Sequence, residues 1–204
     1  MQSILVNGEK VFPSKIVCVG RNYVDHIEEL GNEMPDQMVL FNKPNSAISD
    51  ILRSQVDGEG LHYEGELAFS VRDGRLHAVG FGLDLTKREL QSRLKAKGLP
   101  WERSKAFDGS ALFSEFVTPP EKLDKLSLEL TVDNKSRQSG GVELMIHKPL
   151  EVLREIAAFT TLEDGDVIMT GTPAGVGEIH TGERFEALVR AAGRTLTNAT
   201  WVAQ

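Results

Sequence analysis

Alternation of apolar and polar residues constrains the fold of this chain more than any other feature. From Leu126 to Asp133, leucine or valine occupies every second position up to Val132, which is the pattern of a strand with one buried face. Strand patterns also cover Lys15 to Val19, Asp166 to Thr170, Arg184 to Arg190 and Thr195 to Val202. We therefore predict a fold dominated by β-strands.

One helix with clear ends is predicted between these strands. It covers Lys87 to Lys97, and Thr86 with Glu89 forms the T-x-x-E pattern of a capping box at its start. Gly98 follows the last residue, which is typical of a helix end. This helix directly follows an apolar segment that reads as a strand.

Two further helices are predicted at Tyr23 to Leu30 and from Pro149 onward. Asn22 is the expected N-cap of the first and Gly31 its C′ residue, whereas proline suits the first position of the second. The expected inward face of the second helix consists of Leu150, Leu153, Ile156 and Ala157. Strands separated by isolated helices indicate an α+β fold rather than repeated βαβ units.

The composition excludes several classes of function. The 204 residues carry a net charge of −7, and lysine and arginine form no stripe of the kind that binds nucleic acid. We find no secretion leader and no apolar run of about 18 residues, so we expect a cytoplasmic protein without membrane association. We expect one domain over residues 1–204, in which the single cysteine, Cys18, is a buried thiol without a disulfide partner.

Two glutamates in the segment HYEGELAF give the sharpest chemical signal. Glu64 and Glu66 are two residues apart, so they point to the same side if the segment is a strand. An exposed edge strand would explain the pair without any special role. However, the apolar residues that follow indicate a buried strand, and burial of two adjacent carboxylates is expensive without a cation. A divalent ion such as Mg²⁺, which prefers carboxylate oxygens, would compensate for this cost.

A third carboxylate, Asp84, ends the apolar segment before the clearest helix. It is a candidate metal ligand, and a loop-capping aspartate is the simpler alternative. Arg88 and Gln91 are three residues apart near the start of that helix, so they share a face close to its free amides. This pair suits a substrate carboxylate, although each residue alone would normally be a solvated surface residue.

His26 and Glu29 lie three residues apart on the predicted Tyr23 to Leu30 helix. The carboxylate can orient the imidazole, which is the arrangement of a general base with its supporting residue. A surface histidine is the plainer alternative, and no spacing connects this helix to the three acidic residues. Lys105 and the glycine-rich segment GTPAGVG remain uninformative alone, because the latter lacks the ending of a phosphate-binding loop.

Taken together, these segments resemble the fumarylacetoacetate hydrolase family, and specifically its short, single-domain acylpyruvase branch. The resemblance extends over nearly the whole chain. The matching segments are VCVGRNYVDHIEE, VLFNKP, HYEGELAF, GFGLDLTKRELQ, KGLPWERSKAFDGS, the SRQ turn and LEDGDVIMTGTPAGVG. The resemblance implies a mixed β-sandwich or β-roll with a few short helices, assembled as a homodimer.

The resemblance also assigns roles to individual residues. It implies that Glu64, Glu66 and Asp84 bind Mg²⁺ or Mn²⁺, and that His26 with Glu29 activates water. Lys105 is expected to stabilise an oxyanion. The expected substrate-binding residues are Arg21, Lys43, Arg88, Gln91 and Thr172. Val19 stands where larger relatives carry a fourth acidic ligand, so we expect three protein ligands to the metal.

The implied reaction is hydrolysis of a carbon–carbon bond in a small 2,4-dioxo acid, an acylpyruvate. Water activated by His26 would attack the carbonyl at C4 and release pyruvate and a carboxylic acid. Pyruvate would leave as its enolate, which oxaloacetate decarboxylation also produces, so a second activity on oxaloacetate is expected. Two alternatives stay open: an isomerase or decarboxylase of a 2-oxo-heptenedioate, and a protein that binds metal and oxo acid without turnover.

Overall fold

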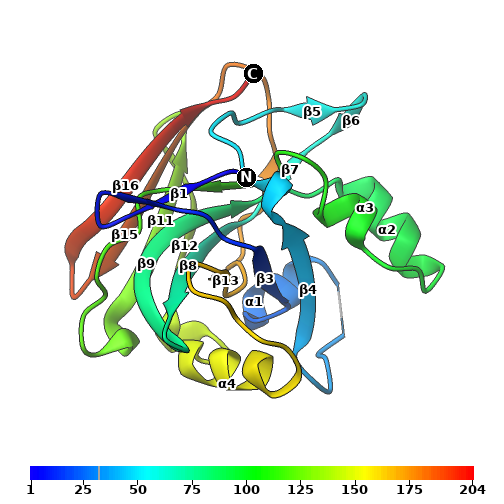
Figure 1. Cartoon of the computed structure of the whole chain (residues 1–204). Coiled ribbons are helices and arrows are strands. Elements are labelled where there is room, and N and C mark those ends of the chain that lie inside the picture. Colours follow the sequence, from blue (N-terminus) through cyan, green and yellow to red (C-terminus); the bar gives the residue numbers. More distant parts are fainter. Residues whose placement is uncertain (32) are drawn as a thin grey trace.

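The two segments that carry the acidic residues are neighbours in a mixed six-stranded sheet. The computed structural model describes residues 1–31 and 33–204 (Figure 1). The sheet has the order β10-β9-β8-β13-β3-β4. Its strands are β3 (Lys15–Gly20), β4 (Val39–Pro44), β8 (Gly65–Arg72), β9 (Arg75–Asp84), β10 (Ala111–Phe113) and β13 (Val167–Met169). Strand β13 pairs in parallel with β3 and antiparallel with β8, so it joins the N-terminal part of the chain to the acidic strands.

A second sheet of four antiparallel strands packs against the first. Its order is β12-β11-β15-β16, with bounds Lys135–Gly141, Leu126–Val132, Arg184–Ala191 and Arg194–Val202. The burial of β11 alternates strictly, as its sequence predicts. Leu128 and Leu130 of this strand share a core with Phe81 and Leu83 of β9, so apolar packing joins the two sheets.

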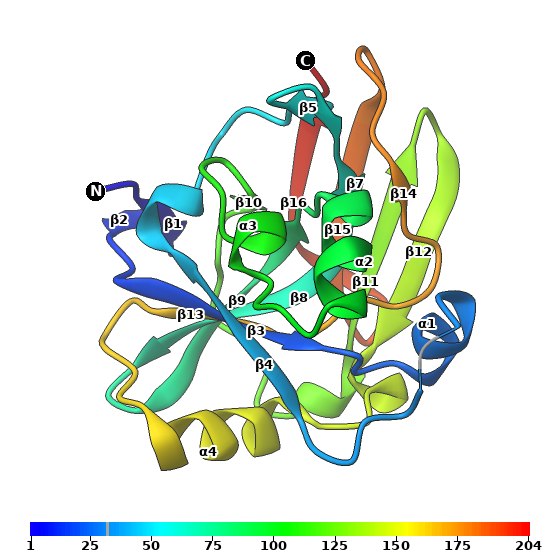
Figure 2. The same cartoon turned by 90° about the vertical axis from the view of Figure 1, so that its right-hand side faces the viewer.

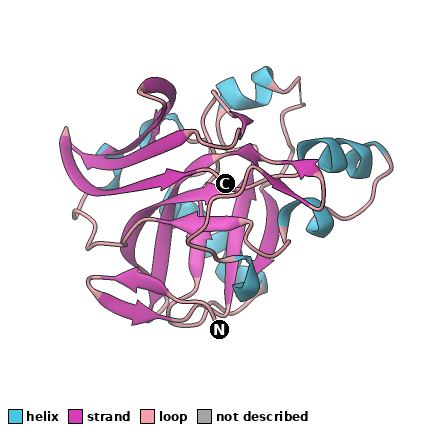
Figure 3. Cartoon of the chain, turned by 90° about the horizontal axis from the view of Figure 1, so that it is seen from above, coloured by secondary structure: helices cyan, strands magenta, loops and turns pink. Residues whose placement is uncertain are grey.

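Shorter strands complete the β structure. They are β1 (Ile4–Val6), β2 (Glu9–Val11), β5 (Gln55–Val56), β6 (Glu59–Gly60), β7 (His62–Tyr63) and β14 (Gly177–Glu178). Strands account for far more of the chain than helices do (Figure 3). The predicted β-rich α+β class is therefore confirmed.

Within the described residues, four α-helices lie around the sheets, one more than the sequence predicts. They are α1 (Val24–Glu29), α2 (Arg88–Ala96), the unpredicted α3 (Glu102–Lys105) and α4 (Pro149–Phe159). Helices α2 and α3 stand in front of the six-stranded sheet in Figure 2. In Figure 1, α4 lies below the sheets, where Val152 and Ile156 pack against β3 and β13. The predicted inward residues Leu150 and Ala157 are exposed instead, because the buried stripe of α4 is shifted toward Val152.

The predicted side-chain caps of α1 and α2 are wrong. Lys87, not Thr86, is the N-cap of α2, and no side chain caps this helix. The Thr86 hydroxyl instead accepts a hydrogen bond from Lys105 at 2.6 Å. The Asn22 side chain donates to the carbonyls of His147 and Thr170 and so joins distant segments rather than capping α1. Tertiary hydrogen bonds have replaced the local ones in both places.

Asp166, just before β13, binds residues at the start of β3. Its replacement by asparagine should destabilise the fold by about 1–3 kcal/mol. Its Oδ1 accepts from the Ser14 amide at 2.8 Å, and its Oδ2 lies 2.6 Å from Lys15 Nζ. Burial opposes ionisation of Asp166, but hydrogen bonds from Lys15 and Ser14 prevail and lower its pKa. A lowered pKa stabilises the folded state above the ordinary aspartate pKa of about 4, and this contribution is lost as the pH falls through the lowered value. Denaturant unfolding at pH 7 and pH 3 measures the free energy of unfolding of both proteins. The stability lost in Asp166→Asn should be smaller at pH 3 than at pH 7. Equal losses at the two pH values would contradict the prediction.

Candidate active site

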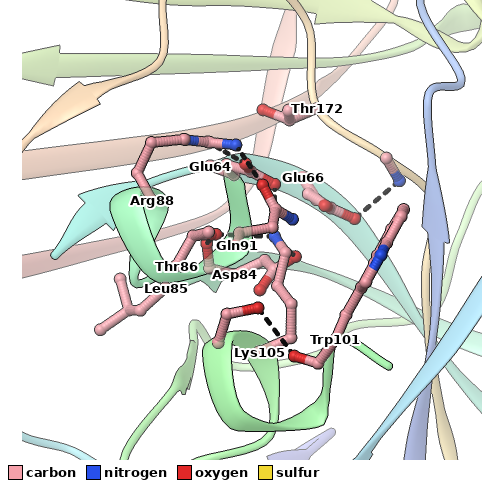
Figure 4. Close-up of polar contacts among 12 residues, drawn as sticks. Glu64, Glu66, Asp84, Leu85, Thr86, Arg88, Gln91, Trp101, Lys105 and Thr172 are labelled. Carbon is pink, nitrogen blue, oxygen red and sulfur yellow. Dashed lines mark hydrogen bonds and ion pairs between the residues drawn. The ribbon is translucent and has the colours of Figure 1, made fainter. Parts of the chain in front are cut away.

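Three buried carboxylates meet where β8 begins and β9 ends. Glu64 precedes β8, Glu66 is its second residue, and Asp84 is the last residue of β9. The Asp84 amide donates to the Glu64 carbonyl at 2.8 Å, which joins the two strand ends. Each carboxylate offers one oxygen, and these oxygens all lie within 4.8 Å of one another (Figure 4). The predicted same-face arrangement of Glu64 and Glu66 is therefore present, with Asp84 beside them.

Lys105 and Arg88 contact this acidic group from two different helices. Lys105 Nζ, from α3, donates to Glu64 Oε2 at 2.8 Å and to Asp84 Oδ2 at 2.7 Å. Arg88 Nη2, from α2, pairs with the other oxygen of Glu64. Lys105 also donates to the Thr86 hydroxyl, so each of its three N–H groups has a hydrogen-bond acceptor. The expected role of Lys105 at an oxyanion therefore requires that it first leave Glu64 or Asp84.

Lys43 lies behind the acidic group and not on the pocket wall. It is fully buried, and its Nζ donates to the backbone carbonyls of Leu85, Lys105 and Ser110. The same ammonium lies 2.8 Å from Asp84 Oδ1 as an ion pair. This position suits support of Asp84, and direct substrate binding by Lys43 stays a prediction.

The carboxylates differ in how well their charges are compensated. Burial raises the pKa of Glu64, yet the charges of Lys105 and Arg88 outweigh burial and hold this pKa well below its usual range. Burial, reinforced by the charges of Asp84 and Glu64, raises the pKa of Glu66 well above its usual range. The Gly171 amide opposes this by donating to Glu66 Oε2 at 2.6 Å. Glu66 is therefore the carboxylate that most needs a further cation.

The donor set fits a divalent metal ion. Asp84 Oδ1 is buried and accepts no hydrogen bond from the described residues, and its partner there is the ion pair with Lys43. Carboxylate oxygens gathered in one group are the ligand type that Mg²⁺ and Mn²⁺ prefer. The residues that would hold the ion are Glu64, Glu66 and Asp84.

His26 reaches the same pocket from α1, which the sequence could not establish. Its side chain is buried and lines the pocket with Glu64 and Glu66. Its Nδ1 lies 3.1 Å from Glu29 Oε2, and Glu29 Oε1 accepts the Gly175 amide at 2.9 Å. Since Nδ1 faces Glu29, the remaining nitrogen, Nε2, is the one available for proton transfer.

The glycine-rich loop of residues 171–177 connects this histidine pair to the acidic group. Gly171 donates to Glu66 and Gly175 donates to Glu29, as described above. Thr172 lines the pocket, and its hydroxyl donates to the Gly65 carbonyl at 2.9 Å. Gln138 of β12, unassigned by sequence, donates to the same hydroxyl at 2.7 Å and accepts the Gly65 amide at 2.8 Å. The loop is therefore part of the site and not only a tight turn.

The pocket encloses about 30 Å³, which is enough for a water molecule. Of the predicted site residues, the structure places His26, Lys105, Arg21, Arg88, Gln91, Thr172, Glu64 and Glu66 in its wall. The other residues of the wall were not predicted as site residues, and they include Phe41, Lys95 and Trp101. Lys95 could have been found from its spacing, because it continues the helix face that Arg88 and Gln91 define.

Comparisons with known proteins agree with this fold. Residues 15–199 match the Fumarylacetoacetate (FAA) hydrolase C-terminal family, so the chain belongs to this family of enzymes. It is 39% identical over 201 residues to "Oxaloacetate tautomerase YcgM" of Escherichia coli, covering 90% of this chain and 91% of that protein. The predicted family membership is confirmed.

Two solved structures extend the comparison. A putative fumarylacetoacetate isomerase/hydrolase from Oleispira antarctica superimposes with a TM-score of 0.94 at 32% identity, over 100% of both chains. Fumarylpyruvate hydrolase from Pseudomonas aeruginosa, solved with Mn²⁺ and pyruvate, gives a TM-score of 0.88 at 28% identity, over 99% of this chain and 95% of that chain. In the described part of this chain, no helix has the length and apolar character needed to cross a membrane.

Proposed function

We propose that this enzyme uses Mg²⁺ or Mn²⁺ to act on a small 2-oxo acid through its enol form. The observation that carries the proposal is the buried group of Glu64, Glu66 and Asp84, whose two glutamates line a pocket together with His26. The names of the relatives support two substrates. Oxaloacetate is the first candidate, because the E. coli relative is named an oxaloacetate tautomerase.

Acylpyruvate hydrolysis is the second candidate, and the His26–Glu29 pair favours it. Hydrolysis needs an activated water, and this pair places an oriented imidazole in the pocket wall. The fumarylpyruvate hydrolase that resembles this chain, and was solved with pyruvate, acts on such a compound. A heptenedioate isomerase remains the alternative, since it would use the same proton-transfer groups.

In the proposed mechanism, different residues of this chain bind the substrate, transfer the proton and stabilise the developing charge. When bound, the metal supplies Lewis-acid polarisation of the 2-oxo group. Arg88 and Gln91 orient the 1-carboxylate from α2, where Arg88 Nη1 already donates to Gln91 Oε1 at 2.9 Å. His26 Nε2 takes a proton from C3 of oxaloacetate, or from water in hydrolysis, while Glu29 stabilises the imidazolium. Lys105, released from the carboxylates, donates to the oxygen on which negative charge develops.

We further propose one catalytic domain over residues 1–204, assembly as a homodimer and a cytoplasmic location. The shared core of the two sheets supports the first part of this proposal. Analytical ultracentrifugation of the purified chain tests the second, and a monomer at micromolar concentration would contradict it. Fractionation of cells tests the third.

A substrate panel tests the proposed activity directly. Acetylpyruvate, fumarylpyruvate, oxaloacetate and a heptenedioate should be assayed with Mg²⁺, with Mn²⁺ and after treatment with EDTA. We expect turnover of oxaloacetate or an acylpyruvate that EDTA abolishes and added metal restores. Turnover unaffected by EDTA would contradict a metal enzyme, and no turnover of any compound would favour a protein that only binds oxo acids.

Glu66→Gln should weaken Mg²⁺ binding by about 10²-fold or more. Loss of an outer partner of a metal ligand already costs roughly 10- to 100-fold, so loss of a direct ligand should cost at least as much. Titration calorimetry with Mg²⁺ measures the affinity. Glu89→Gln, an exposed glutamate on α2, is the matched control and should bind Mg²⁺ normally. Unchanged affinity in Glu66→Gln would remove Glu66 from the ligand set.

A further inference from the structure

Lys95 lies in the pocket wall but has no part in the mechanism described above. It is on α2, four residues after Gln91 and seven after Arg88, so the three side chains share one face of the helix. All three line the pocket. Gln91 and Lys95 are about 6 Å apart along the helix axis, a distance that a short diacid can cover.

An aromatic ring holds the Lys95 ammonium in place. Its Nζ lies 4.7 Å from the centre of the Trp101 ring, which also lines the pocket. This is a favourable cation–π distance, and it gives the ammonium a fixed position without neutralising its charge. Phe41 packs beside Trp101 with ring centres 6.1 Å apart and also lines the pocket.

The charge of Lys95 is not compensated as those of its neighbours are. Arg88 pairs with Glu64, and Lys105 pairs with Glu64 and Asp84. Within residues 1–31 and 33–204, no carboxylate forms an ion pair with Lys95. Burial, together with the positive charges of Arg21 and Arg88, lowers the pKa of Lys95 to about 8. An anion at this point would relieve the unfavourable charge.

We propose that Lys95 binds the distal carboxylate of a dicarboxylate 2-oxo acid and so determines the preference of the enzyme for dicarboxylate over monocarboxylate substrates. The inference rests on the proposed function, which places the 2-oxo acid end at the acidic group and Arg88. The other end of the substrate then extends along α2 toward Lys95. Trp101 and Phe41 flank this end with apolar surface, and the Lys95 ammonium beside them supplies a positive charge that recognises a carboxylate.

Titration calorimetry with two inert 2-oxo acids tests the inference. In the presence of Mg²⁺, 2-oxoglutarate and 2-oxobutyrate share the 2-oxo acid end and differ in the distal carboxylate. Lys95→Met should weaken 2-oxoglutarate binding by about 10- to 100-fold, because a hydrogen bond between charged groups is lost. Binding of 2-oxobutyrate should change less than twofold. Lys95→Arg should retain most of the preference, and Lys97→Met, an exposed lysine on the same helix end, should retain all of it.

Three outcomes would overturn the inference: wild-type protein that binds the two acids equally, Lys95→Met that weakens both equally, and Lys95→Met that weakens neither. In Lys95→Met, the KM for oxaloacetate should rise by about the same factor as the loss of affinity for 2-oxoglutarate. If wild-type protein turns over oxaloacetate but Lys95→Met does not alter the preference, the inference fails and the proposed function stands. Failure of wild-type protein to turn over any panel substrate would instead count against the proposed function.

Discussion

His26→Gln is expected to lower acylpyruvate hydrolysis by about 10²–10⁴-fold, the usual contribution of a positioned general base. Hydrolysis needs a water that has lost a proton, whereas decarboxylation of oxaloacetate does not. Decarboxylation should therefore fall by less than about tenfold. The Gly175 amide donates to Glu29 independently of His26, so we expect the change in this variant to be confined to the imidazole. Steady-state kinetics with both substrates at saturating Mg²⁺ give the ratio of the loss of hydrolysis to the loss of decarboxylation.

Two other variants make this ratio interpretable. Asp84→Asn should depress both reactions together, because both depend on the metal that Asp84 is proposed to hold. His147→Gln alters a second histidine, which lies 2.8 Å from Glu151 near the surface, and should leave both reactions unchanged. If His26→Gln reduced both reactions equally with normal Mg²⁺ affinity, His26 would hold substrate or close the pocket, and water activation would be excluded.

The local parts of the site could be predicted from sequence because strand and helix geometry determine them. Glu64 and Glu66 share a side because a strand has a period of two, and His26 meets Glu29 because they are three residues apart on a helix. The strand patterns at Leu126 to Asp133 and Lys15 to Val19 are reproduced closely by β11 and β3. In each case the relevant partner is a few residues away in the chain.

The meeting of these parts could not be predicted from residue spacing, because distant strand pairing creates it. Gly175 reaches Glu29 across 146 positions of the chain, and Gly171 reaches Glu66 across 105. Both contacts depend on β13, which pairs with β3 and β8 and delivers the loop to the pocket. The failed capping prediction at Thr86 has the same origin, since Lys105 of α3 engages that hydroxyl. The family resemblance supplied these connections where residue spacing could not.

Gly175→Ala is expected to reduce acylpyruvate hydrolysis by about 10²-fold or more, although Gly175 touches neither the acidic group nor His26. Gly175 has a φ of +100°, and a Cβ atom there would lie 1.8 Å from the carbonyl oxygen of Arg137. The loop and β12 would have to separate by roughly an ångström, a displacement that can cost ~10²-fold in rate. The Gly175 amide would then lose Glu29 Oε1, and Glu29 would no longer orient His26.

Gly182→Ala is the matched control for backbone strain. Gly182 has a φ of +90°, but a Cβ atom there meets no heavy atom within 4 Å. Both variants should lose about 1–3 kcal/mol of stability from the unfavourable conformation, with a larger loss at Gly175 because of the clash. Thermal unfolding reports the stability lost to backbone strain, and the kinetics of both reactions report whether Glu29 is still positioned for catalysis. Gly175→Ala should lose hydrolysis more than decarboxylation, as His26→Gln does, whereas Gly182→Ala should retain both. Equal retention of hydrolysis in the two variants would show that the loop does not position Glu29 for catalysis.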